Sequence, residues 1–328
     1  MRRSSLLLVI VVLFLTTACA APKFKLMPDE TDPLREYTLE GSAKEKILLI
    51  PVRGMISDNP KQGMFSSSPS MVDQVVSHLR KAEKDKQIKV VLIKINSPGG
   101  TITASDLLYH EINAFKERTG AKIVVSMMEM ATSGAYYMSL PADVIMAHPT
   151  SVTGSVGVIF LQPKVKGLMD KIGVGVDVSK YGKYKDMGSP FRAGNEEEQK
   201  LFQKTVNDLG DRFVNLVRKH RKMTEAALAD MSTARIFLPE EALKMGLIDK
   251  IGYLNDAVRE SKMLAGLPQD ARVVVFRRNE YPEDNLYNVA GVAAENLKPA
   301  LVNIELPDIL GLHAGFYYLW PGAVAADQ

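Results

Sequence analysis

Runs of apolar residues alternate with amphipathic segments through most of the chain. Aliphatic and β-branched runs predict strands at residues 47–52, 88–95, 122–127, 144–147, 174–179 and 272–276. Apolar residues spaced three and four apart, or short apolar segments after a strand, predict helices at residues 70–86, 104–118, 134–140, 196–221, 224–231 and 239–245. Strands that alternate with helices predict an α/β fold with mainly parallel pairing and right-handed crossovers.

The start of the first helix carries a local signal. Ser70 precedes the apolar face, and Asp73 follows three residues later. A hydroxyl and a carboxylate at this spacing predict a capped helix N-terminus.

Both ends of the chain differ from this pattern. Residues 21–45 are rich in Pro, Lys, Asp and Glu and lack hydrophobic periodicity, which predicts a flexible linker. We expect a signal segment at 1–19, a linker at 20–45, one domain at 46–280 and a C-terminal extension at 281–328. The extension holds the aromatic run 316–320, which is interpreted as an oligomer contact, a membrane-surface contact or a strap over the core.

The N-terminus predicts export. Arg2 and Arg3 precede an apolar run at 6–15, and small residues follow it up to Cys19. Cys19 is the only cysteine and lies where a bacterial lipoprotein signal is cut, so we expect lipidation there; a free thiol and an uncleaved membrane anchor are the alternatives. Each anchored form predicts a membrane-tethered protein of the cell envelope with its domain on the extracytoplasmic side. A mature domain without cysteine has no disulfide.

Composition and net charge exclude few classes of protein. The chain has 328 residues, 46% hydrophobic and 24% charged, with a net charge of +3 and no long basic block. These values are typical of a globular protein and do not indicate a nucleic-acid track.

Ser133 is the main candidate for chemistry. It follows an apolar strand and precedes a short helix, with small residues Gly134 and Ala135 after it. A serine here is suited to act as a nucleophile, because a helix N-terminus stabilises developing negative charge. A serine that simply caps the helix fits the same pattern, and both readings stay open.

Backbone donors for an oxyanion are predicted nearby. Gly99 and Gly100 follow Pro98 at the end of another strand, where they expose N–H groups without side chains. We expect the N–H groups of Gly100 and Gly134 to form an oxyanion hole, with a plain tight turn as the alternative.

The base is predicted to be a lysine. The five histidines lie on charged helix faces, in a loop or in the tail, and no Gly-x-Ser-x-Gly surrounds Ser133. Lys185 is the preferred lysine, Lys180 and Lys183 are its competitors, and a solvated loop lysine is the alternative. A lysine base has to be buried away from counter-ions, since only the neutral amine accepts a proton.

Several segments together resemble the signal peptide peptidase A (SppA) family of serine-lysine peptidases, in its short single-domain form. The matching segments, in chain order, are Asn96 to Gly100, Ala131 to Tyr137, Ala142-Asp143, Thr153 to Val158, Tyr184 to Pro190 and Ala242 to Gly252. The resemblance covers about residues 47–252. Thr132 and Ala135 depart from it, since the family commonly has alanine and glycine there.

This resemblance implies a ClpP/crotonase-like α/β fold with repeated ββα units. It implies Ser133 as nucleophile, Lys185 as general base, Gly100 and Gly134 at the oxyanion, and Ser155 as a residue that orients the lysine. It also implies an oligomeric ring of protomers in which Ser and Lys meet across a subunit boundary.

We therefore expect an exported, membrane-tethered serine endopeptidase with a Ser-Lys dyad. Its partners would be peptide substrates, such as residual signal peptides or membrane-proximal polypeptides, and further copies of the chain, with no nucleic acid, cofactor or metal. One alternative is a non-catalytic scaffold of the same fold that binds peptides or envelope partners. A crotonase-type acyl-CoA enzyme is the other, and export disfavours it because CoA thioesters are cytoplasmic.

Overall fold

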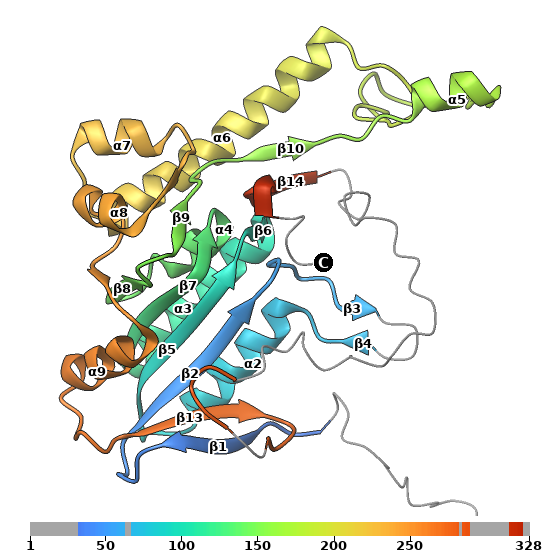
Figure 1. The fold of residues 1–328 in the computed structure, drawn as a ribbon. Coiled ribbons are helices and arrows are strands. Elements are labelled where there is room, and N and C mark those ends of the chain that lie inside the picture. Colours follow the sequence, from blue (N-terminus) through green and yellow to red (C-terminus); the bar gives the residue numbers. More distant parts are fainter. Residues whose placement is uncertain (1–31, 63–66, 282–283, 289–314, 324–328) are drawn as a thin grey trace, which may run out of the picture.

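A mainly parallel sheet forms the centre of the molecule. The computed structural model describes residues 32–62, 67–281, 284–288 and 315–323, and Figure 1 shows their arrangement. The main path of the nine-stranded sheet runs through β1 (Arg35–Glu40), β13 (Arg272–Arg277), β2 (Lys46–Arg53), β5 (Ile88–Ser97), β7 (Lys122–Thr132), β8 (Val144–Ala147) and β12 (Lys250–Ile251). β9 (Val152–Gly154) pairs with the end of β7, and β11 (Ile236–Phe237) pairs with β9.

The α/β class predicted from the sequence is confirmed. Pairing is parallel from β13 through β2, β5, β7 and β8 to β12, and antiparallel only at β1 and β11. Such strands are buried on both faces, which explains why they are continuous apolar runs.

Successive residues of the central strands pack into two separate cores. In β2, Leu48 and Ile50 join the larger core, whereas Ile47 and Leu49 join the smaller one on the opposite face. The larger core is covered by α2 (Met71–Glu83), α3 (Ile102–Thr119) and α4 (Gly134–Ser139), and the smaller one by α9 (Leu254–Leu264).

An arm projects from this body (Figure 1). It consists of β10 (Ile159–Leu161), α5 (Lys166–Ile172) and the first part of α6 (Glu196–His220). α7 (Glu225–Met231) and α8 (Pro239–Met245) follow α6 beside the body. The remaining short elements are β3 (Lys61–Gln62), β4 (Ser67–Ser68) and the 3-10 turn η3 (Pro321–Ala323).

A second sheet connects arm and body. β14 (Gly315–Leu319) lies between β10 of the arm and β6 (Gly99–Thr101) of the body, antiparallel to both. Phe160 of β10 stacks on Phe316 of β14, with ring centroids 4.4 Å apart. β14 therefore joins β10 of the arm to β6 of the body.

The predicted cap at the start of α2 is confirmed. The Ser70 hydroxyl accepts a hydrogen bond from the Asp73 N–H at 3.1 Å, and the Asp73 carboxylate accepts one from the Ser70 N–H at 3.3 Å. The pair forms a complete capping box.

Two predicted segments differ from the structure. Arg35–Glu40 forms β1 within the range expected to be a flexible linker, because it hydrogen-bonds along β13 at the sheet edge. Residues 174–179 do not form a strand, because no neighbouring strand pairs with them in the single chain. Their valines, Val174, Val176 and Val178, are exposed instead.

The predicted signal segment and Cys19 lie outside the described residues. Within the ranges that are described, none of the helices combines the length and the apolar character needed to cross a bilayer.

His78 yields a prediction about pH and stability. The side chain is buried on α2, its Nδ1 has no hydrogen-bond partner among the described residues, and its ring meets Phe276 edge-on. Burial first, and the charge of Arg278 second, lower the pKa of His78 from 6.5 to about 4. The neutral imidazole therefore favours the folded state.

Stability from this group should be present above pH 6.5 and lost as the pH falls toward 4, because the unfolded chain takes up the proton first. We expect a loss of about 3 kcal/mol in the free energy of unfolding across this range. The free energy of unfolding of His78→Leu, measured with urea at pH 7 and at pH 4, should fall less between these two pH values than that of the native protein. The difference should be about 3 kcal/mol. An equal loss in both proteins would contradict the prediction.

Candidate active site

Ser133 lies at the junction of β7 and α4 in a strained backbone conformation. Its φ is 53° and its ψ is −115°. A positive φ in a residue with a side chain costs on the order of 1–3 kcal/mol and persists only where the surroundings enforce it. Here the Ser133 N–H donates to the Gly154 carbonyl at 2.8 Å, and the Ser133 carbonyl accepts from the Tyr137 N–H at 2.9 Å. β9 and α4 thus hold the residue from both sides.

The Ser133 hydroxyl is buried and makes no hydrogen bond. The residue is 1% exposed, and its Oγ has no partner among the described residues. It therefore does not cap α4 through its side chain, although it occupies the N-cap position. The neighbouring Thr132 Oγ1 also lacks a partner. A buried hydroxyl without a partner costs about 1–3 kcal/mol, so this arrangement is not explained by stability.

Gly99 and Gly100 form β6 directly beside Ser133. Ile56 lies against them: its N–H donates to the Gly99 carbonyl at 2.8 Å, and its carbonyl accepts from the Thr101 N–H at 3.0 Å. A Cβ on Gly100 would lie 1.8 Å from the Ile56 carbonyl oxygen. Only glycine fits at position 100, because the Ile56 backbone is too close for a side chain. This contact goes beyond the plain tight turn that was the alternative from the sequence.

The carbonyl oxygen of Tyr318 lies at the point where these glycines approach Gly134. A Cβ built on Gly99 would be 2.2 Å from that oxygen, and one built on Gly134 would be 3.1 Å from it. The same Cβ on Gly134 would be 3.2 Å from the Gly100 nitrogen. The register pairs Tyr318 with Gly100. A peptide carbonyl of the chain itself therefore lies beside Gly100 and Gly134, the two glycines expected to form the oxyanion hole.

The side chain of Tyr318 is fully buried below this carbonyl. Its ring stacks on Tyr137 of α4 at 5.1 Å and contacts Phe213 of α6 at 4.8 Å between centroids. Its hydroxyl donates to the Leu209 carbonyl at 3.0 Å. The aromatic run at the C-terminus thus fits the strap over the core, one of the three interpretations of the sequence.

Ser155 follows the residue that accepts the Ser133 N–H bond. β9 pairs with β7 so that Thr132 lies opposite Gly154, which brings Ser155 close to Ser133. Ser155 is 7% exposed and has a φ of 52°. In the described part of the chain, Ser133, Ser155 and Ala234 are the three residues other than glycine with positive φ. Two of these three strained residues were candidates from the sequence.

Lys185 lies apart from Ser133. It belongs to the loop that joins α5 to α6 on the arm, whereas β7 and α4 lie in the body (Figure 1). The residue is exposed. The single chain therefore does not bring the predicted nucleophile and base together.

The two competing lysines, Lys180 and Lys183, are each paired with a carboxylate. Lys180 forms an ion pair with Asp186 at 2.5 Å, and Lys183 forms one with Glu197 at 2.5 Å. The Lys185 amine has no hydrogen bond or ion pair to any residue that the structure describes. Lys185 is thus the lysine of this loop whose amine stays available.

Among the described residues, no histidine forms a hydrogen bond or a ring contact with Ser133, and His110 is exposed on α3. His220 hydrogen-bonds Tyr109 at 2.8 Å, His148 bonds Thr150 at 2.9 Å, and His78 is buried on α2. His313 lies outside the described residues. Among residues that are described, no group of three or more His, Cys, Asp or Glu side chains is placed to hold a metal ion.

Three contributors to the site were missed from the sequence. Ile56 and Tyr318 approach Ser133 only through pairing with β6, and no local pattern reports that pairing. Ser105 of α3 donates to the Thr101 carbonyl at 2.9 Å and packs against Gly134, whose Cβ would lie 2.3 Å from its Oγ. The only signal for Tyr318 was the aromatic run around it.

Comparisons with known proteins show similarity to peptidases. The model of peptidase family S49 matches residues 115–268, and that of Clp protease matches residues 65–155. An Enterococcus faecium protein named provisionally as signal peptide peptidase SppA is 36% identical over 76% of this chain and 72% of its own. Protease 4 of Haemophilus influenzae is 30% identical over 86% of this chain and 44% of its own.

One solved structure is also similar. The 1510-N membrane-bound stomatin-specific protease, in its S97A mutant, has 15% sequence identity and a TM-score of 0.44. That comparison covers 73% of this chain and 100% of the other.

The family match and the match to Clp protease confirm the predicted ClpP/crotonase-like fold. Identity of 36% across most of both chains extends well beyond the short motifs around Ser133. The chain belongs to peptidase family S49, the SppA family of serine peptidases.

Proposed function

We propose that the chain is an exported, membrane-tethered serine endopeptidase in which Ser133 attacks the peptide and Lys185 is the general base. One observation carries the proposal: Ser133 has a strained backbone and a buried hydroxyl without a partner, directly beside Gly100 and Gly134. Strain and unpaired polar groups concentrate at functional sites.

The proposed reaction has two halves. Ser133 Oγ bonds to the substrate carbonyl carbon while Lys185 Nζ takes the hydroxyl proton. The N–H groups of Gly100 and Gly134 stabilise the oxyanion, the C–N bond breaks, and Lys185 returns the proton to the leaving amine. Water then attacks the acyl ester with Lys185 again as base, which releases the acid and restores Ser133.

This chemistry requires a second copy of the chain. A lysine base has to be buried, whereas Lys185 is exposed and on the arm. The arm also exposes large apolar side chains, listed in chain order as Leu168, Ile172, Val174, Val176, Val178 and Tyr181. Exposed apolar side chains in one region are typical of an interface. We propose a ring in which the arm of one protomer brings Lys185 to Ser133 of its neighbour, with Ser155 orienting the amine.

The substrates proposed are residual signal peptides and other membrane-proximal polypeptides. The Enterococcus faecium relative carries signal peptide peptidase in its name. Lipidation of Cys19 would tether the domain to the extracytoplasmic side of a membrane, where such peptides remain after export.

Ser133→Ala and Lys185→Ala should each abolish hydrolysis of fluorescein-labelled casein without changing the thermal unfolding of the chain. When the two inactive variants are unfolded, mixed in equal amounts and reassembled, about one quarter of native activity should return, because half of the sites receive an intact serine and half of those an intact lysine. Each variant reassembled alone is the control.

Full activity in either single variant would reject the dyad. A mixture as inactive as its components, although it forms assemblies of native size, would place Ser133 and Lys185 of one site on the same protomer.

β14 should limit access to Ser133. Tyr318 places its carbonyl beside Gly99 and Gly134, and β14 pairs along β6, so a substrate strand needs the same positions. An occupant within the same chain acts at an effective concentration in the mM range.

A chain that ends at residue 314 should therefore react with a fluorophosphonate at Ser133 roughly tenfold faster than the full chain, since the competing strand is absent. Mass spectrometry of the adduct over time measures the rate. Tyr318→Phe keeps the strand and the buried ring and should react at the native rate. Equal rates for the truncated and full chains would show that β14 does not restrict the serine.

A further inference from the structure

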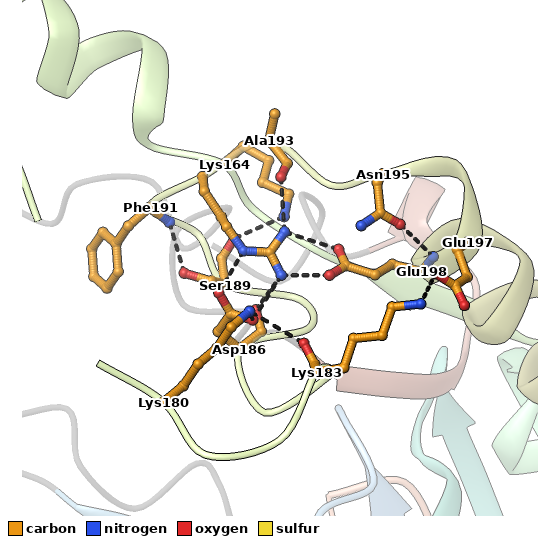
Figure 2. Close-up of polar contacts among 11 residues, drawn as sticks. Lys164, Lys180, Lys183, Asp186, Ser189, Phe191, Ala193, Asn195, Glu197 and Glu198 are labelled. Atoms are coloured by element: carbon orange, nitrogen blue, oxygen red, sulfur yellow. Dashed lines mark hydrogen bonds and ion pairs between the residues drawn. The ribbon is translucent and has the colours of Figure 1, made fainter. Parts of the chain in front are cut away.

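The loop that carries Lys185 is held by one arginine. Arg192 donates to the Asp186 carboxylate from Nε at 2.7 Å and from Nη2 at 3.0 Å, and Nη2 also reaches the Asp186 carbonyl at 3.0 Å. Figure 2 shows the polar contacts of this loop, with Asp186 and Glu198 labelled. Arg192 thus fixes both the backbone and the side chain of the residue that follows Lys185.

The same guanidinium fixes the loop to α6. It donates to the Glu198 carboxylate from Nη1 at 3.0 Å and from Nη2 at 2.5 Å. Glu198 is 3% exposed, in the first turn of α6, where its N–H donates to the Asn195 side chain at 2.9 Å. α6 is anchored in the larger core by Phe213 and Val217. Arg192 therefore connects the loop to a helix that packs against the body.

The bonds to Arg192 also determine where the Asp186 carboxylate points. Asp186 is next to Lys185 in sequence and would be its nearest counter-ion, yet its oxygens are taken by Arg192 and Lys180. Hydrogen bonds from Arg192 first, and from Lys180 second, hold the pKa of Asp186 well below its usual range. The carboxylate therefore stays ionised and bound away from Lys185.

Most other charged groups around this loop are paired. Lys183 forms an ion pair with Glu197, Arg192 forms one with Glu198, and the Tyr184 hydroxyl donates to Glu197. Among the described residues of the loop, Lys185 and Asp177 are the two charged side chains without a partner, and Lys185 is the only such cation. A lysine that has to lose its proton needs such an environment, because a facing carboxylate stabilises the charged amine.

We infer that Arg192 is a positioning residue for the reaction: it holds the Lys185 loop on α6 and keeps the Asp186 carboxylate from pairing with Lys185. The inference rests on the proposed role of Lys185 as base. A bidentate arginine is suited to the task because its planar fork binds two carboxylates at once, which a lysine cannot do.

The test is the pH dependence of fluorophosphonate labelling of Ser133 in the assembled full chain. In Arg192→Gln the Asp186 Oδ2, which Lys180 does not bind, loses its partner and should pair with Lys185. The rise of the labelling rate with pH should therefore move to higher pH by about one unit, which is a roughly tenfold loss of rate at a given pH on the rising part of the profile. In Asp186→Asn the labelling rate should rise at the same pH as in the native protein. The double variant Arg192→Gln/Asp186→Asn should also show the native pH profile, because it has no Asp186 carboxylate that could pair with Lys185.

Arg118→Gln is the matched control. Arg118 also makes two bonds to one carboxylate, Glu83, at 2.8 and 3.2 Å, between the C-terminal ends of α2 and α3. It should leave the pH profile unchanged. If Arg192→Gln does not assemble, Arg192→Lys carries the same test, because its single ammonium cannot hold both carboxylates and the pH profile should shift the same way.

The inference would be overturned if the labelling rate of an assembled Arg192 variant rose at the native pH. It would also be overturned if the pH profile of the double variant were shifted as far as that of Arg192→Gln alone. Lys185→Ala separates this from the proposed function. If Lys185→Ala is labelled at the native rate, the assignment of Lys185 as base has failed. If Lys185→Ala is not labelled and the pH profile of Arg192→Gln is unshifted, only the role of Arg192 is rejected.

Discussion

The hydrogen bond from the Ser133 N–H to the Gly154 carbonyl is the contact on which the candidate site depends. β7 first pairs with β8 and then, after a shift of register against β5, with β9. This change of partner ends the strand beside Gly154 and turns the chain into α4. The strained φ of Ser133 follows, because strand and helix fix the residue from opposite sides. Ser155 occupies the mirrored position at the end of β9 and shares the strain.

The body and the arm contribute different chemistry. Around Ser133 the described groups are backbone amides, hydroxyls and aromatic rings, all buried. On the arm, successive ion pairs join Lys180, Asp186, Arg192 and Glu198, and Lys183 pairs with Glu197. A deeply buried charge is costly unless it is fully paired, whereas a network at the surface keeps access to water. This division lets the serine lie in a buried site while the ionisable groups of the arm remain in contact with solvent.

Local patterns predicted much of the fold and part of the site. β8 and α8 have the predicted bounds, and the capping box at Ser70 formed as expected, because each depends on residues close in sequence. Ser133, Gly100 and Gly134 were located by the same kind of signal, and the structure brings these three together.

The errors and omissions share one physical cause, which is pairing over long distances in sequence. β1 needs β13, more than 230 residues away, and β14 needs β6 and β10. Residues 174–179 have the composition of a strand but no partner in the single chain. The sequence already favoured Lys185 over Lys180 and Lys183, but it could not give the physical difference between them, which lies in the carboxylate that each lysine meets.

The position of β14 has a consequence for the order of synthesis. β14 is the central strand of its sheet, and β6 and β10 each pair with it and not with each other. A ribosome releases β6 and β10 long before residue 315 emerges, so the second sheet cannot form until β14 has been made. During synthesis, the strands of the body and of the arm are therefore both present before the strand that joins them.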